Sequence, residues 1–264
     1  MRREPAKPNH LLRYRLVDGI AVLTLNNSGR RNALSTEMLS ALKEHLERIK
    51  DDSAVRVVVL RAEGPVFSSG HDLRELHAAG DKDNARIFAL CTEVMEAIRL
   101  LPQPVIAQVH GLATAAGCQL VASCDIAIAS EEATFATPGV KIGLFCTTPG
   151  VALVRAVPPK KAMEMLLTGM PISAREALQH GLVSRVVPAE ELEERCMELA
   201  HQVATASSHV VAIGKRAFYQ QLELDRPAAY EVAQRVMLQN LQSYDAKEGI
   251  EAFLDKREPK WKDI

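Results

Sequence analysis

The sequence lacks any paired or clustered set of cysteines. Its five cysteines are scattered along 264 residues, with no CxxC pair and no Cys/His cluster. This pattern indicates neither a disulfide framework nor a structural zinc site, so we assign no metal ligand. We expect the thiols to stay reduced, as they do in a reducing compartment.

Long apolar runs and an excess of one charge are also absent. No apolar run approaches the roughly 20 residues that a membrane-spanning helix needs. The 32 Lys and Arg residues balance 33 Asp and Glu residues, for a formal net charge of −1. A general nucleic-acid binder usually has a strongly basic face, so this balance argues against a nucleic-acid partner. Residues 1–10 are basic but lack the apolar core of a secretory signal, and we expect residues 1–12 to form a disordered terminus.

What the chain does contain is an alternation of apolar strands and amphipathic helices over its first two thirds. The apolar runs that predict buried strands are 19–25, 55–60, 104–109 and 125–129. Between them, apolar residues recur at the spacing of a helix, for example over 84–100. Beyond Pro188 the pattern is almost entirely helical. This order favours an α/β fold with crossover connections, followed by a helical region.

A turn of small residues, His110 to Cys118, follows the strand expected at 104–109. We predict that Gln119–Ala122 begins a helix after this turn. A strand, a turn with exposed backbone N–H groups and a helix N-terminus can together hold an anion or an oxyanion. The alternative is that the Ala and Gly residues only let the helix pack closely on the sheet. The local residues alone leave both interpretations open.

Six motifs, taken in order, resemble the enoyl-CoA hydratase/isomerase (crotonase) superfamily. They are Arg31–Leu34, Phe67–Leu73, His110–Leu120, Cys124–Ala129, Phe135–Pro138, and Leu167–Gly169 with Ala174–Leu182. Each motif alone is a weak signal, but their order and spacing together are specific. Within the superfamily the chain looks like the mitochondrial enoyl-CoA hydratase domain-containing proteins.

The resemblance implies an α/β fold of the crotonase type. We expect a spiral of ββα units over residues 13–200 and a C-terminal helical oligomerisation region over residues 201–264. It also implies a homo-oligomer, either a trimer or a hexamer made of two trimers. Acyl-coenzyme A (acyl-CoA) thioesters of fatty-acid and lipid metabolism are the implied ligands. No permanently bound cofactor and a mitochondrial matrix location are implied as well.

In the family, two backbone N–H groups hold the thioester oxygen, and by motif these fall here on His71 and Ala116. One such donor is worth about 10²–10³ in rate. The family's contacts to CoA fall on the matching residues of two loops and the last helix, Arg30, Ala33, Ser69, Leu73, Arg74 and Lys256. Because CoA carries several phosphate charges, arginine and lysine suit the mouth of its pocket. The alternative for each basic residue is a solvated surface charge.

The chain departs from the family where hydratases carry two catalytic glutamates. Gln119 and Gly139 occupy those positions, and the loop 143–150 contains no acid. An amide cannot take a proton from water near neutral pH, and a general acid or base contributes about 10²–10⁴ in rate. We therefore do not expect efficient enoyl-CoA hydration. His71 has an imidazole that could titrate near neutral pH, but we expect the ring to face solvent.

Two functions stay open on this evidence. The first is an acyl-CoA-binding protein without efficient hydratase activity. The second is an enzyme on acyl-CoA, of decarboxylase, thioesterase or isomerase type, that relies on enolate or oxyanion stabilisation. RNA binding, which one branch of the superfamily performs through a lysine-rich helix, is disfavoured here. The matching helix, 35–50, mixes its basic residues with glutamates and so resembles a solvated face.

Overall fold

The computed structural model describes residues 10–264, so residues 1–9 of the expected disordered terminus lie outside the described part of the chain. For the last residues of that expected terminus the structure differs from the expectation. Leu11 and Leu12 are buried, and strand β1 (Leu12–Val17) begins within the segment. Leu12 pairs with Leu25 of the neighbouring strand, which explains why the chain is ordered from this point.

Within residues 10–264, ten strands form two sheets. The larger sheet has the order β1-β2-β3-β5-β7-β10, and the smaller sheet has the order β4-β6-β8-β9. The remaining strands of the larger sheet are β2 (Ile20–Leu25), β3 (Val57–Ala62), β5 (Val105–Val109), β7 (Ile126–Ser130) and β10 (Arg185–Val187). Those of the smaller sheet are β4 (Val66–Ser68), β6 (Leu112–Thr114), β8 (Thr134–Ala136) and β9 (Ile172–Ser173).

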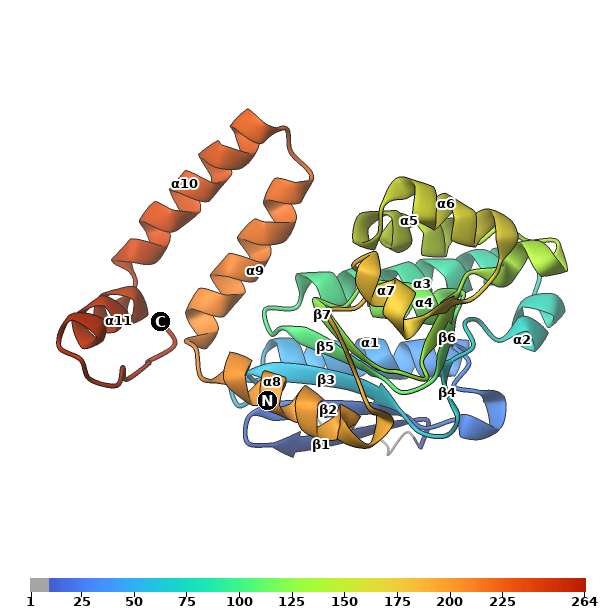
Figure 1. The fold of residues 1–264 in the computed structure, drawn as a ribbon, viewed down its shortest axis with the longest axis horizontal. Coiled ribbons are helices and arrows are strands. Elements are labelled where there is room, and N and C mark those ends of the chain that lie inside the picture. The colour runs from blue at the N-terminus through green and yellow to red at the C-terminus, as the bar shows by residue number, and fades with distance from the viewer. Residues whose placement is uncertain (1–9) are drawn as a thin grey trace.

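The two sheets are built by a repeated path of the chain (Figure 1). The pairs β3-β4, β5-β6 and β7-β8 each place one strand in the larger sheet and the next in the smaller sheet, and helices follow each pair. Neighbouring strands from successive turns are parallel, as crossover connections require. This is the spiral of ββα units that the resemblance predicts, so the predicted fold class is confirmed.

Helices cover both faces of the larger sheet. On one face, Ala21, Leu23 and Leu25 of β2 join a core with α1 (Thr36–Lys50), α3 (Asp81–Leu100) and α4 (Ala116–Ala122). On the other face, Ile20 and Val22 pack with residues of α8 (Leu192–Ala204). The central strands are therefore apolar on both sides, which explains why they appear in the sequence as continuous apolar runs.

Shorter helices complete the core. They are α2 (Leu73–Ala78), α5 (Thr147–Ala156), α6 (Pro159–Thr168) and α7 (Ala174–Gln179), with 3-10 turns at Ser28–Arg30, Pro138–Ile142 and Ala189–Glu191. Ser173 and Glu176 form a capping box at the start of α7, and Gly181 follows its end with φ +85°. Both features match the helix signals in the sequence.

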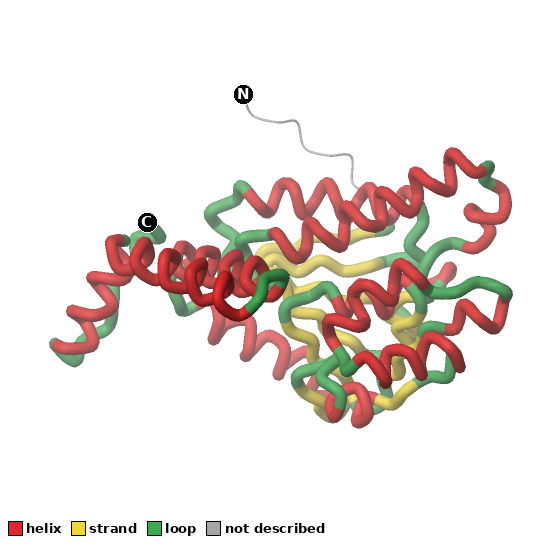
Figure 2. Tube along the Cα trace, turned by 90° about the horizontal axis from the view of Figure 1, so that it is seen from above, coloured by secondary structure: helices red, strands yellow, loops and turns green. Residues whose placement is uncertain are grey.

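The last three helices form an arm that extends from the core (Figures 1 and 2). We call α9 (Ser208–Leu222), α10 (Arg226–Gln242), α11 (Tyr244–Leu254) and the tail 255–264 the C-terminal arm. Because Cys196 and Ala200 of α8 pack on the sheet, the whole of α8 belongs to the core. The C-terminal arm thus begins at Ser208, and the expected boundary at residue 201 falls within α8.

A buried polar cluster fastens α9 to the core. The Lys215 ammonium donates to the Ile98 and Gln103 carbonyls, at 3.0 and 3.1 Å, and lies 2.7 Å from the Asp125 carboxylate. The Tyr219 hydroxyl donates to the other oxygen of Asp125, at 2.8 Å. Asp125 also accepts from the backbone N–H of Val105, at the start of β5. The arm is therefore attached to the start of the central strands.

Candidate functional site

The small-residue turn contains a strained residue immediately before α4. Ala115 has φ 51° and ψ −121°, and α4 begins at Ala116, three residues earlier than predicted. A residue other than glycine in such a region costs of order 1–3 kcal/mol and marks sites where function demands the backbone path. The N–H of Ala115 donates to Ala136, at 2.9 Å, which fixes the turn to β8. The N–H of Ala116 is left pointing out of the first turn of the helix.

The backbone of the loop before α2 packs directly against the backbone of this turn. A Cβ at Gly70, which has φ +84°, would lie 3.0 Å from the Ala116 nitrogen, and a Cβ at Gly117 would lie 2.8 Å from Cβ of Ser68. Only glycine permits this approach, and it brings residues 70–71 next to residue 116. Within residues 10–264, neither the N–H of His71 nor that of Ala116 donates to a protein acceptor. The two amides expected to hold an oxyanion are thus neighbours and unpaired.

The imidazole of His71 is not solvent-facing, contrary to expectation. Both ring nitrogens are buried. The ring meets Phe88 of α3 edge-on, with 5.2 Å between centroids. Burial lowers the pKa of His71, although the Leu34 backbone and the Glu75 charge oppose the change, so the ring is neutral at physiological pH.

The two positions that lack glutamate differ in their surroundings. Gln119 lies on α4, is 6% exposed, and its side-chain oxygen is buried without a partner. Gly139 is held against the following loop, because its N–H donates to Cys146 Sγ at 3.3 Å and its carbonyl accepts from Leu144 at 2.9 Å. A Cβ at Gly139 would lie 2.9 Å from both the Leu144 oxygen and Cys146 Sγ. The space for a second side chain is therefore already filled.

Other groups near these positions are not free to act as bases. Asp125 is engaged by Lys215, Tyr219 and the backbone of β5, and Glu131 and Glu132 are exposed. Burial raises the pKa of Cys118 to about 12, so this thiol stays protonated and serves packing. Within residues 10–264, no group of three His, Cys, Asp or Glu side chains is arranged to bind a metal ion.

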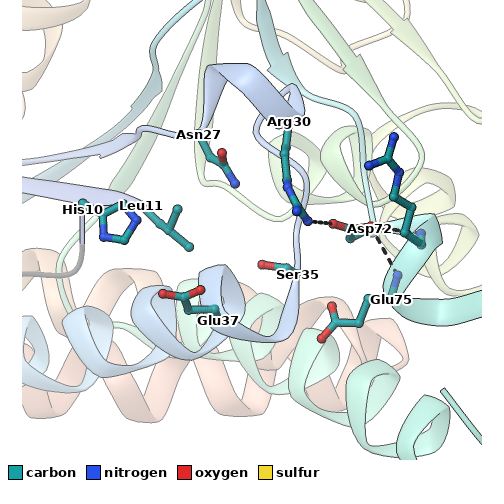
Figure 3. Close-up of a pocket in the computed structure, with 9 residues that line it drawn as sticks. His10, Leu11, Asn27, Arg30, Ser35, Glu37, Asp72 and Glu75 are labelled. Carbon is teal, nitrogen blue, oxygen red and sulfur yellow. Dashed lines mark hydrogen bonds and ion pairs between the residues drawn. The ribbon is translucent and has the colours of Figure 1, made fainter. Parts of the chain in front are cut away.

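Two of the three basic residues expected to contact CoA lie around a polar cleft of about 630 Å³ (Figure 3). Arg30 and Arg74 both line it, with Asn27, Ser35 and several carboxylates. Arg30 points toward Asp72, at 3.1 Å, and Asp72 also caps α2 by accepting from the N–H groups of Arg74 and Glu75. These hydrogen bonds and Arg30 lower the pKa of Asp72 against the effect of its burial.

The other expected CoA contacts divide into two groups. Ala33, Ser69 and Leu73 belong to the same pair of loops, which are joined by hydrogen bonds from Ser69 to Arg31 and from Leu34 to Gly70. Leu73 is exposed, and Ala33 is buried. Lys256 follows α11 on the arm, and Figure 1 shows α11 and α2 at opposite ends of the molecule. A single chain therefore does not bring Lys256 to the cleft.

Two residues that hold these loops were missed in the sequence. Asn32 is fully buried and donates to the carbonyls of Glu63 and Val66, and it accepts from the N–H of Asn27. Asp72 joins Arg30 to α2, as described above. The pair Asp72 and Glu75, three residues apart before a helix, is a capping signal that could have revealed the second.

Comparisons with known proteins agree with this geometry. The model of the enoyl-CoA hydratase/isomerase family matches residues 15–264. The chain belongs to this family. Enoyl-CoA hydratase domain-containing protein 3, mitochondrial, of Rattus norvegicus is 54% identical over 258 residues, which cover 97% of this chain and 86% of that protein.

Solved structures of family members are also close. The human enoyl-CoA hydratase domain-containing protein 3 is 54% identical, with a TM-score of 0.93 over 95% of this chain and 100% of that one. An enoyl-CoA hydratase of Mycobacterium smegmatis is 47% identical, also with a TM-score of 0.93, over 95% and 98% of the two chains. The crotonase fold is thus shared along nearly the whole chain, and the predicted resemblance is confirmed.

Family membership gives the site its chemical context. Members of the enoyl-CoA hydratase/isomerase family act on CoA thioesters without a permanent cofactor and are typically oligomeric. Within residues 10–264, no helix combines the length and apolar character needed to cross a bilayer. The neighbouring backbones at His71 and Ala116, and the absence of acidic side chains at Gln119 and Gly139, are the two features on which a functional proposal can rest.

Proposed function

We propose that this protein binds acyl-CoA thioesters of lipid metabolism in the mitochondrial matrix and is not an efficient enoyl-CoA hydratase. The observation that carries the proposal is the pair of adjacent, unpaired backbone N–H groups at His71 and Ala116. Such donors suit a thioester carbonyl oxygen, which gains negative charge when an enolate forms. The names of the similar mitochondrial proteins support the location.

The proposal that hydration is weak rests on the groups that would move protons. Gln119 can orient a water molecule through its unpartnered oxygen but cannot accept a proton near neutral pH. Gly139 has no side chain, and the Leu144–Cys146 loop occupies the space beside it. Loss of one general acid or base costs about 10²–10⁴ in rate, and both are missing here.

The CoA end of the ligand is assigned to the cleft of Figure 3. Arg30 and Arg74 supply positive charge there for phosphate groups, with Ala33, Ser69 and Leu73 on the adjoining loops. Lys256 takes part only if the arm of a neighbouring subunit brings it to the cleft. We therefore propose that the functional form is a homo-oligomer, a trimer or a hexamer, in which the arm contacts a second subunit.

An enzyme that acts on acyl-CoA by enolate or oxyanion stabilisation is the second candidate. The buried neutral imidazole of His71, next to its own amide, favours this alternative. Decarboxylation and thioester hydrolysis need less from a side-chain base than hydration does, whereas isomerisation requires a group that moves a proton along the acyl chain. Assays with malonyl-CoA, crotonyl-CoA and saturated acyl-CoA would separate this candidate from a pure binding protein.

Removal of one oxyanion donor tests the main proposal. Ala116 is the first residue of α4, where proline fits the helix but carries no N–H. We expect Ala116→Pro to weaken butyryl-CoA binding on the order of tenfold in titration calorimetry. Asp81→Pro, at the exposed first position of α3, is the matched control and should bind as the wild type does.

Three outcomes would change the proposal. Equal affinity of Ala116→Pro and wild type would remove the amide from the binding site. Absence of acyl-CoA binding by the wild-type protein would refute it altogether. Turnover of any thioester that is present in the wild type and lost in Ala116→Pro would favour the enzyme over the binding protein.

A further inference from the structure

The loop that precedes α1 contains two consecutive residues in the left-handed region, Arg31 with φ 52° and Asn32 with φ 49°. Neither is glycine, and left-handed residues other than glycine usually occur singly. Asn32 is also fully buried, and its own N–H donates to the carbonyl of Asn27 at 2.9 Å. Such a backbone path persists only where surrounding contacts hold it, and it marks positions where the path itself serves function.

The side chain of Asn32 supplies the contacts that hold this path. Its nitrogen donates to the carbonyls of Glu63 and Val66, both at 2.8 Å, and its oxygen accepts from the N–H of Asn27, also at 2.8 Å. Val66 is the first residue of β4, which leads into the loop that carries His71. Asn32 therefore joins the loop before α1 to the start of the strand that precedes this amide.

Ser68, at the end of β4, extends the connection toward the amide. Its side chain is fully buried, and its hydroxyl donates to the carbonyl of Asn32 at 2.9 Å and accepts from the N–H of Gly70 at 3.3 Å. Ser68 also lies against α4, because a Cβ at Gly117 would lie 2.8 Å from the Cβ of Ser68. A single residue thus contacts Asn32, the residue before His71 and the first turn of α4.

Backbone hydrogen bonds join the two loops at the same place, from Ser69 to Arg31 at 3.0 Å and from Leu34 to Gly70 at 2.8 Å. Residues 68–70 are therefore bound to residues 31–34 along their whole length. The groups of a binding site must be held within about 0.5 Å of their productive positions by a supporting layer of contacts. The contacts between these loops thus govern the position of the amide that follows Gly70.

We propose that Asn32 and Ser68 are positioning residues that hold the His71 N–H in place to share one thioester oxygen with the second amide. The inference rests on the proposed function. Neither side chain is placed to touch a ligand, because both are fully buried and bonded to the protein. Loss of either side chain should therefore weaken recognition of the thioester carbonyl through the displaced amide.

Calorimetric titration with two matched ligands tests this inference. Butyryl-CoA has the thioester carbonyl, whereas S-butyl-CoA, a thioether of the same chain length, lacks that oxygen. The wild type should bind butyryl-CoA on the order of tenfold more tightly than S-butyl-CoA. Ser68→Ala removes one hydroxyl, and Asn32→Gly removes a side chain at a φ that glycine adopts readily. Both variants should bind the two ligands within about twofold of each other.

The ratio of the two affinities separates positioning from a loss of stability. A variant that is only less stable has a smaller folded fraction, which weakens the apparent binding of both ligands by the same factor. Its ratio would stay that of the wild type. Ser130→Ala is the matched control, because Ser130 is fully buried and its hydroxyl donates to the carbonyl of His110 at 3.0 Å. This control should keep the wild-type ratio.

The outcomes distinguish this inference from the function on which it rests. A wild-type ratio in either variant overturns the inference and leaves acyl-CoA binding intact; should Asn32→Gly not fold, Ser68→Ala alone decides. A ratio that falls equally in Ser130→Ala overturns it as well, since the loss of any buried hydroxyl would then suffice. Equal affinities of the wild type for the two ligands overturn it by removing the amides from the site. No binding of either ligand by the wild type would refute the proposed function itself.

Discussion

At the scale of the residue, the two positions without glutamate differ in the space that they offer to an acidic side chain. Gln119 is buried on α4 and has nearly the same size as glutamate, so Gln119→Glu would add no volume there. Gly139 is enclosed by Leu144 and Cys146, whose atoms would lie 2.9 Å from any Cβ. A side chain at position 139 would therefore require the backbone of the loop at Leu144 to move.

This difference predicts that Gly139 tolerates no larger residue. Gly139→Ala, and more so Gly139→Glu, should lower the free energy of unfolding by about 1–3 kcal/mol, the usual cost of overpacking. Urea unfolding followed by circular dichroism would measure the loss. Gly29→Ala is the control, because a Cβ there meets nothing within 4 Å, and it should change stability by no more than about 0.5 kcal/mol. Wild-type stability of Gly139→Ala would show that the loop yields easily.

The residue scale also shows what the sequence could and could not predict. The family resemblance pointed to the amides of His71 and Ala116, and Gly70 and Gly117 allow the close backbone approach of the two loops that carry them. The buried orientation of the His71 ring was not predicted, since it depends on Phe88 of α3, distant in the chain. The crowding at Gly139 was missed for a related reason: the chain returns against itself at Cys146.

At the scale of the element, the attachment of α9 depends on one buried ion pair. The side chains of Lys215 and Asp125 are 8% and 14% exposed. Burial lowers the pKa of Lys215, and its contact with Asp125 opposes this effect. Burial also raises the pKa of Tyr219, as does the same carboxylate. Helical spacing predicted α9 itself, but no local pattern could reveal that one of its lysines reaches Asp125.

Breaking this pair should destabilise the protein strongly. Lys215→Met removes the positive charge and leaves the Asp125 carboxylate buried with only Tyr219 and the Val105 N–H, at an expected cost of about 3–5 kcal/mol. Lys247→Met, exposed on α11, is the matched control and should leave the unfolding midpoint in urea unchanged. A variant at Lys215 with wild-type stability would mean that α9 is held by other contacts.

Two acidic residues of α11, Glu248 and Asp245, hold the tail 255–264 in place by hydrogen bonds. Hydrogen bonds from Arg257 and from the N–H of Lys260 lower the pKa of Glu248 to about 2. Asp245 also has a lowered pKa: its burial acts in the opposite direction, but hydrogen bonds from Ser207, Lys262 and Asp263 outweigh it. Trp261, the single tryptophan, donates to the Thr205 carbonyl between α8 and α9. The tail therefore closes back onto the start of the arm.

These shifts predict that the tail is released by acid. A carboxylate with a depressed pKa stabilises the fold fully above its unfolded pKa, near 4.5 for Glu248, and loses the contribution as the pH falls toward about 2. The emission of Trp261 should shift to longer wavelength over this range as the indole becomes hydrated. Glu248→Gln should shift the emission already at neutral pH, whereas Glu231→Gln, exposed on α10, should behave as the wild type.

At the scale of the whole molecule, the C-terminal arm exposes several large apolar side chains to solvent. Phe253 and Leu254 of α11 are 82% and 71% exposed, and Tyr230, Met237 and Leu238 of α10 are also exposed. Beside them, an apolar pocket of about 440 Å³ lies between Val210 of α9, Ile250 of α11 and Trp261. Contiguous apolar surface of this kind marks an interaction site. We expect a second copy of the chain to cover this apolar surface, because members of the family are typically oligomeric.

The oligomer should therefore depend on the arm and in turn control ligand binding. Phe253→Glu places a charge in the expected interface, and light scattering after gel filtration should then report the 28.9 kDa monomer instead of a trimer or hexamer. Leu16→Glu, on the exposed side of β1, should leave the assembly intact. In the proposed oligomer, Lys256 reaches the cleft from a neighbouring subunit, so we expect the monomeric variant also to bind CoA more weakly. Lys256→Gln should reproduce the weaker CoA binding without loss of assembly, which separates the contact from the interface. A Phe253→Glu protein that stays oligomeric would show that the arm serves another purpose.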